Sequence, residues 1–115
     1  MKYLPMLLLC VLVLFLLKKR FFDTTDYKAL LEEGAIIVDV RSPAEFSGSN
    51  IENSLNIPVG ELVNKLEYLK DKNQTIITCC ASGMRSGAAK QLLVAKGYKH
   101  VINGGGWSSL NAKIK

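Results

Sequence analysis

The chain contains little cysteine and almost no histidine, with three Cys and one His among its 115 residues. Cys79 and Cys80 are neighbours and Cys10 lies in an apolar run, so no spaced pair is present that would form a disulfide framework or a zinc site. Unpaired thiols favour a reducing compartment. The one histidine, His100, lies far along the chain from Cys80, and we do not expect it to act as a general base. The sequence implies no metal and no organic cofactor.

Positive charge is also scarce outside the N-terminal segment, although the formal net charge of the whole chain is +5. Four of the fifteen Lys and Arg residues lie within the first twenty positions, which leaves eleven against ten Asp and Glu in the rest of the chain. A nucleic-acid-binding domain concentrates basic residues on the domain itself. The near-neutral remainder therefore excludes nucleic acid as an expected partner.

The N-terminal segment is an uncharged apolar run from Tyr3 to Leu17, followed at once by Lys18, Lys19 and Arg20. This pattern predicts one transmembrane helix, with residues 1–20 as a membrane anchor and 21–115 as the folded domain. The excess of cations after the run places the domain in the cytoplasm, at the plasma (inner) membrane, as a single-pass protein. The run is short against the ~20 residues that a span needs, and Phe21 with its neighbour lengthens it if the cations snorkel.

Two alternatives for this segment remain open. A cleaved signal peptide would export the domain, but such a peptide carries its charge in front and a small-residue cleavage site behind. Here only Lys2 and the amino terminus stand in front, and no small-residue site follows. A helix buried in the folded domain would need a polar face, and the run has none.

The remaining residues alternate short β-branched runs with helical patterns. Such alternation predicts an α/β fold, in which a central parallel sheet of about five strands carries helices on both faces. Phe21 and Phe22 are expected to add an edge strand. The other expected strands are 35–40, 54–58, 75–79 and 100–103. The expected helices begin near Thr24 or Thr25, at the capping box Ser42-Pro43-Ala44-Glu45, near Glu61 and at Ser86.

The strand at 75–79 delivers Cys80 to the edge of the sheet where ligands bind in such folds. Small residues and Gly83 then lead into a helix N-terminus, where backbone N–H groups and the helix dipole favour an anion. A cysteine in this position is expected to ionise readily. Arg85 supplies a cation that can hold an anion against the sulfur. Cys79 is expected to point into the core as a small apolar side chain.

Three charged residues follow the first buried strand, and we assign them to structural support. Asp39 and Arg41 are expected to form an ion pair that stabilises the fold, with Glu45 as a further partner.

Three sequence blocks resemble the rhodanese family, and together they span nearly everything after residue 21. The first is Asp39-Val40-Arg41 with Glu45-Phe46, Ile51 and Asn56-Ile57-Pro58. The second is Cys80-x-x-Gly83-x-Arg85-Ser86, and the third is Gly104-Gly105-Gly106-Trp107. The resemblance implies a rhodanese-like fold and a sulfurtransferase that carries sulfane sulfur as a persulfide on Cys80. The donor would be thiosulfate or a persulfide, and the acceptor cyanide or a thiol, including a protein thiol.

The active loop implied by the resemblance supplies the substrate-binding residues, which are Ala81, Ser82, Gly83, Met84 and Arg85. This loop departs from the family where a second cation is common, because Ala81 follows the cysteine and Met84 stands at another position where polar residues are common. With one cation left, a persulfide donor or a protein partner is favoured over thiosulfate, which is a dianion.

Two other functions fit parts of the pattern. Counted from Cys79, the spacing Cys79-x5-Arg85 matches a phosphatase or arsenate reductase, whose anion needs the wider ring. Thr78 stands where such phosphatases carry histidine. The second alternative is a membrane-bound binding module that uses the fold without catalysis.

Overall fold

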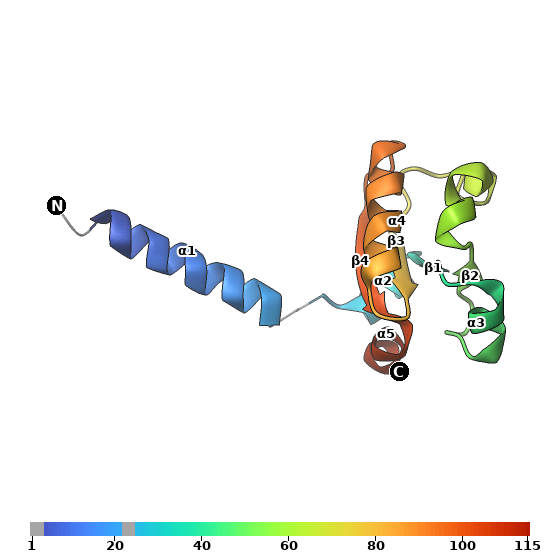
Figure 1. The fold of residues 1–115 in the computed structure, drawn as a ribbon, viewed down its shortest axis with the longest axis horizontal. Coiled ribbons are helices and arrows are strands. Elements are labelled where there is room, and N and C mark those ends of the chain that lie inside the picture. The colour runs from blue at the N-terminus through green and yellow to red at the C-terminus, as the bar shows by residue number, and fades with distance from the viewer. Residues whose placement is uncertain (1–3, 22–24) are drawn as a thin grey trace.

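The computed structural model describes residues 4–21 and 25–115, and within the first helix it describes the side chains of residues 5–14. That helix, α1 (Leu4–Phe21), stands apart from the other elements (Figure 1). All of its described side chains are exposed. Within the described residues, no helix combines the length and the apolar character that crossing a membrane requires.

A four-stranded, all-parallel sheet forms the centre of the domain, with strand order β2-β1-β3-β4. The strands are β1 (Ile36–Asp39), β2 (Leu55–Asn56), β3 (Ile76–Cys80) and β4 (Val101–Gly106). Within the described residues the sheet therefore has four strands, and not the expected number of about five. Phe21, expected at a sheet edge, is instead the last residue of α1, and Phe22 lies outside the described residues.

Helices cover both faces of the sheet. One face packs against α4 (Met84–Ala95) and the 3-10 segment η1 (Val59–Tyr68). The other packs against α2 (Tyr27–Glu32) and α5 (Trp107–Ile114). Successive side chains of the fully buried strand β3 alternate between these faces, as the period of a strand requires. The short helix α3 (Pro43–Gly48) follows β1.

The predicted start of α3 is confirmed, whereas the predicted cap of α2 is wrong. The Ser42 hydroxyl accepts from Glu45 N–H and the Glu45 side chain accepts from Ser42 N–H, so the predicted capping box is confirmed. Helix α2, in contrast, is capped by Asp26, whose carboxylate accepts from Ala29 N–H at 3.1 Å, and not by the threonines before it. An aspartate is as good a cap as threonine, and a choice between neighbouring candidates depends on the backbone path.

The glycine segment after the last expected strand belongs to β4 itself. A Cβ at Gly104 would lie 2.8 Å from the Ile77 side chain, and one at Gly106 would lie 2.9 Å from the Ala81 carbonyl oxygen. Glycine therefore lets the end of β4 approach β3 and the segment after it more closely than any other residue would. This close approach shapes the carboxyl edge of the sheet.

Candidate active site

The neighbouring cysteines Cys79 and Cys80 point to opposite faces of the sheet. Cys79 packs in the cluster that contains Ile77 and Leu110, whereas Cys80 packs in the cluster that contains Leu93. Burial, reinforced by the nearby Asp39 carboxylate, raises the pKa of the Cys79 thiol to about 12. Cys79 therefore stays protonated at neutral pH, and the wider frame from Cys79 to Arg85 provides no thiolate for phosphate chemistry.

The Cys80 sulfur is surrounded by hydrogen-bond donors from the start of α4. Gly83 N–H donates to it at 2.9 Å and Ser86 N–H at 3.4 Å, and the Ser86 hydroxyl oxygen lies 3.4 Å away. Burial opposes ionisation of Cys80, but the hydrogen bond between its sulfur and the Ser86 hydroxyl, together with those from the backbone of residues Ser86, Ser82 and Gly83, outweighs it. The net effect lowers the pKa of the Cys80 thiol below its ordinary value, so the thiolate is stabilised.

Gly83 gives the loop its shape. Its φ of +102° lies in the left-handed region, and it is the N-cap of α4. In this conformation the N–H groups at positions 83 and 86 both reach the sulfur. Helix α4 begins at Met84, two residues before the expected start, so the positive end of its dipole also lies at this loop.

A series of side-chain hydrogen bonds connects the Cys80 loop and the start of α4 to β3 and β4. The Ser86 hydroxyl donates to Asn103 Oδ1 at 2.6 Å, and Gly105 N–H donates to the same oxygen at 2.9 Å. Asn103 Nδ2 donates to the Gly83 carbonyl oxygen at 3.3 Å, so this side chain connects β4 to the loop. Thr78 Oγ1 donates to the Ser86 carbonyl oxygen at 2.9 Å and ties the first turn of α4 to β3.

Sequence reasoning missed Asn103 and the role of Ser86. A signal for Asn103 was available, since it is a polar residue near the carboxyl end of a strand, and side chains in such positions meet at one edge of a parallel sheet. For Ser86, its place in the first turn of a helix directly after the thiolate loop was the available signal.

The positive charge of Arg85 is compensated by a carboxylate. Its guanidinium forms a two-pronged ion pair with Glu45 of α3, with Nη1–Oε1 at 2.7 Å and Nη2–Oε2 at 3.0 Å. Hydrogen bonds from Arg85, and then from Ser42, lower the pKa of Glu45 to about 2. The side chain of Glu45, assigned by the sequence to support Asp39 and Arg41, thus binds Arg85, a residue assigned to substrate binding.

Asp39 and Arg41 form a separate, buried pair at the end of β1. Arg41 Nη2 lies 2.7 Å from Asp39 Oδ2, with exposed side-chain fractions of 4% and 0%. The guanidinium also donates to the Ser49 carbonyl oxygen at 2.7 Å and lies 4.7 Å from the centre of the Trp107 ring. These contacts connect the end of β1 to Ser49, which follows α3, and to Trp107 of α5. The pair therefore stabilises the part of the fold beside the loop.

The outer surface of the loop is neutral and open. Ala81 and Ser82 are exposed, and the Met84 side chain is 84% exposed. His100 immediately precedes β4 and therefore lies at the amino end of the sheet, away from Cys80. Among the residues that the structure describes, no group of three or more metal-ligating side chains occurs.

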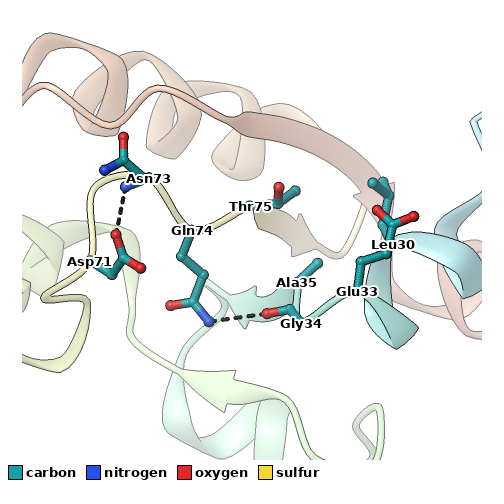
Figure 2. Close-up of a pocket in the computed structure, with 8 residues that line it drawn as sticks. All are labelled: Leu30, Glu33, Gly34, Ala35, Asp71, Asn73, Gln74 and Thr75. Atoms are coloured by element: carbon teal, nitrogen blue, oxygen red, sulfur yellow. Dashed lines mark hydrogen bonds between the residues drawn. The ribbon is translucent and has the colours of Figure 1, made fainter.

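A polar hollow lies at that same amino end of the sheet (Figure 2). It is lined by residues that precede β1 and β3, among them Gly34 and Gln74, whose side-chain amide donates to the Gly34 carbonyl oxygen at 3.1 Å. The hollow is therefore separated from Cys80 by the length of β3, and it contributes nothing to the thiolate site.

Comparison with known proteins decides the family. The family model described as "Rhodanese-like domain" matches residues 23–113. The chain belongs to the rhodanese-like family. The thiosulfate sulfurtransferase PspE of Escherichia coli (strain K12) is 37% identical over 70 residues, which cover 60% of this chain and 67% of that protein.

Solved structures agree with this assignment to the rhodanese-like family. A structure described as rhodanese with anions from E. coli superimposes with a TM-score of 0.63 at 34% identity, covering 66% of this chain and 91% of that one. The human single-domain sulfurtransferase TSTD1 superimposes with a TM-score of 0.65 at 30% identity, covering 72% and 87%. The fold expected from the resemblance is confirmed in its rhodanese-like α/β form.

Proposed function

We propose that this rhodanese-like protein is a sulfurtransferase that carries sulfane sulfur on Cys80. The observation that carries the proposal is the Cys80 sulfur, which sits among the N–H groups of Gly83 and Ser86 with a lowered pKa. A sulfur held in this way is present as the nucleophilic thiolate in a larger fraction than an ordinary cysteine at the same pH. The same donors can stabilise the terminal sulfur anion of a persulfide, because they converge on the Cys80 sulfur to which it is bonded.

The proposed reaction has two steps. The Cys80 thiolate attacks the outer sulfur of the donor, the S–S bond of the donor breaks, and its electron pair leaves with the rest of the donor. With thiosulfate the products are the Cys80 persulfide anion and sulfite. With an organic persulfide they are the Cys80 persulfide and a thiol. An acceptor thiolate or cyanide then attacks the terminal sulfur, and Cys80 leaves as the thiolate.

The test is mass spectrometry of the full chain after treatment with thiosulfate or with an organic persulfide. We expect an added mass of about 32 Da, that of one sulfur atom, on the peptide that contains Cys80, and its loss after a thiol or cyanide is added. Failure of every donor to add sulfur to Cys80 would favour a non-catalytic binding module instead.

We also propose that the N-terminal segment holds the domain at the plasma (inner) membrane, on its cytoplasmic side. Support comes from the exposed apolar side chains of α1, which include Met6, Leu7 and Leu14, and from the cluster of cations that follows them. In cells that express the full chain, we expect the protein in the membrane fraction after a high-salt wash, protected from protease added outside. A soluble protein with its original N-terminus would contradict this, and an exported chain cleaved near residue 20 would show a signal peptide.

A further inference from the structure

The ion pair between Arg85 and Glu45 has matched geometry, and its carboxylate is also held by Ser42. The two guanidinium nitrogens of Arg85 match the two carboxylate oxygens of Glu45, the geometry in which this pairing is strongest. Glu45 Oε1 also accepts from the Ser42 hydroxyl at 3.0 Å and from Ser42 N–H at 3.3 Å. The capping box of α3 therefore fixes the carboxylate before it meets Arg85. Arg85 faces a positioned partner, and not a mobile surface side chain.

This pair removes the uncompensated charge from the active loop. Within the loop sequence from Cys80 to Ser86, Arg85 is the one cation, and its neighbours Ala81, Ser82 and Met84 are neutral. When a Cys80 thiolate meets thiosulfate, the reacting groups together carry a charge of about −3, and no free cation of the loop offsets it. An organic persulfide brings at most one negative charge at its reacting sulfur. Its carbon part can also lie on the Met84 side chain, which is 84% exposed.

We infer that Glu45 determines donor choice in this protein: by neutralising Arg85 it directs the site toward organic persulfides and away from thiosulfate. The inference rests on the proposed sulfurtransferase function. In the favoured reaction, the Cys80 thiolate and R–S–SH give the Cys80 persulfide anion and R–SH, so atoms and charge balance without a further reactant.

The deciding variant is Glu45→Gln. Glutamine is accepted in the capping box in place of glutamate, so the start of α3 is retained while the negative charge is removed. We expect kcat/KM for thiosulfate to rise about tenfold, because Arg85 becomes free to bind the dianion. For the persulfide of 2-mercaptoethanol, whose organic part is neutral, kcat/KM should stay within about twofold.

Two further variants separate charge from other effects. Glu61→Gln removes the same charge from an exposed pair on η1, where Glu61 lies 3.6 Å from Lys65, and it should change neither donor's kinetics. The double variant Glu45→Gln/Arg85→Gln has no ion pair and no free cation, so its kcat/KM for thiosulfate should return to about the unsubstituted value.

The outcomes are distinguishable from failure of the proposed function. If the unsubstituted protein transfers sulfur but folded Glu45→Gln shows an unchanged ratio of the two donors, the inference is wrong and the function stands. If no donor forms a Cys80 persulfide, the function itself fails. Should Glu45→Gln not fold, Glu45→Ala removes the same negative charge from Arg85. A rise in thiosulfate use relative to the persulfide then supports the inference, and an unchanged ratio overturns it.

Discussion

Replacing Cys80 by Ser is expected to abolish persulfide formation and to lower kcat/KM for sulfur transfer by more than about 10³-fold. Serine keeps an acceptor for the Gly83 N–H, so the loop retains its shape, but its hydroxyl does not ionise at neutral pH and forms no persulfide. The measurement is steady-state transfer from a persulfide donor, together with the mass of the peptide that contains residue 80.

The matched control for this substitution is Cys79→Ala. Cys79 lies on the opposite face of the sheet, where burial keeps it protonated, so its loss should leave sulfur transfer within about threefold. Alanine is preferred to serine here because a hydroxyl placed among the apolar side chains of Ile77 and Leu110 would be buried at the cost of its hydrogen bonds to water. Transfer that survives Cys80→Ser and is lost in Cys79→Ala would overturn the assignment of the nucleophile.

Replacing Asp39 by Asn is expected to lower the free energy of unfolding by about 3–5 kcal/mol, because it leaves the Arg41 guanidinium buried without its counter-charge. For a domain of this size such a loss lowers the midpoint of thermal unfolding by more than about 10 °C. Asparagine has nearly the volume of aspartate, so the effect reports charge and not packing. Thermal and urea unfolding of the full chain measure it.

The control for this loss is Lys65→Gln, which breaks the exposed ion pair with Glu61. Solvent screens that pair, so the substitution should change stability by less than about 1 kcal/mol. The double variant Asp39→Asn/Arg41→Met should be more stable than Asp39→Asn alone, because it removes the unpaired cation. A stability of Asp39→Asn within about 1 kcal/mol of the unsubstituted chain would show that the buried pair is not the support that its contacts indicate.

The ion pair of Arg85 changes the interpretation of the loop as an anion-binding site. A cation next to the nucleophile predicts anion binding, and that was the reason for placing Arg85 among the substrate-binding residues. In the structure its charge is matched by Glu45, and the sulfur is stabilised by the N–H groups of Gly83 and Ser86. The lowered pKa of Cys80 therefore depends on the hydrogen bonds at the start of α4 and not on Arg85, and we propose that the ion pair sets which donors react.

The sequence by itself determined the features that short-range chemistry controls. The β-branched runs predicted β1 and β3, Ser42 and Glu45 predicted the start of α3, and the order of strand, cysteine, glycine and helix placed Cys80 at the carboxyl edge of the sheet. Each of these depends on residues within a few positions of one another, so the pattern is visible along the chain.

The tertiary structure alone decided the contacts between distant segments. Glu45 and Arg85 are forty positions apart, and Ser86 and Asn103 are seventeen apart, so only the packing of α3 and β4 around α4 brings these pairs together. The inclusion of the glycines in β4 was likewise set by the space left beside Ile77 and Ala81. Local propensity carries no information about such neighbours, which hold Arg85 and Ser86 in place beside the cysteine that the sequence had already located.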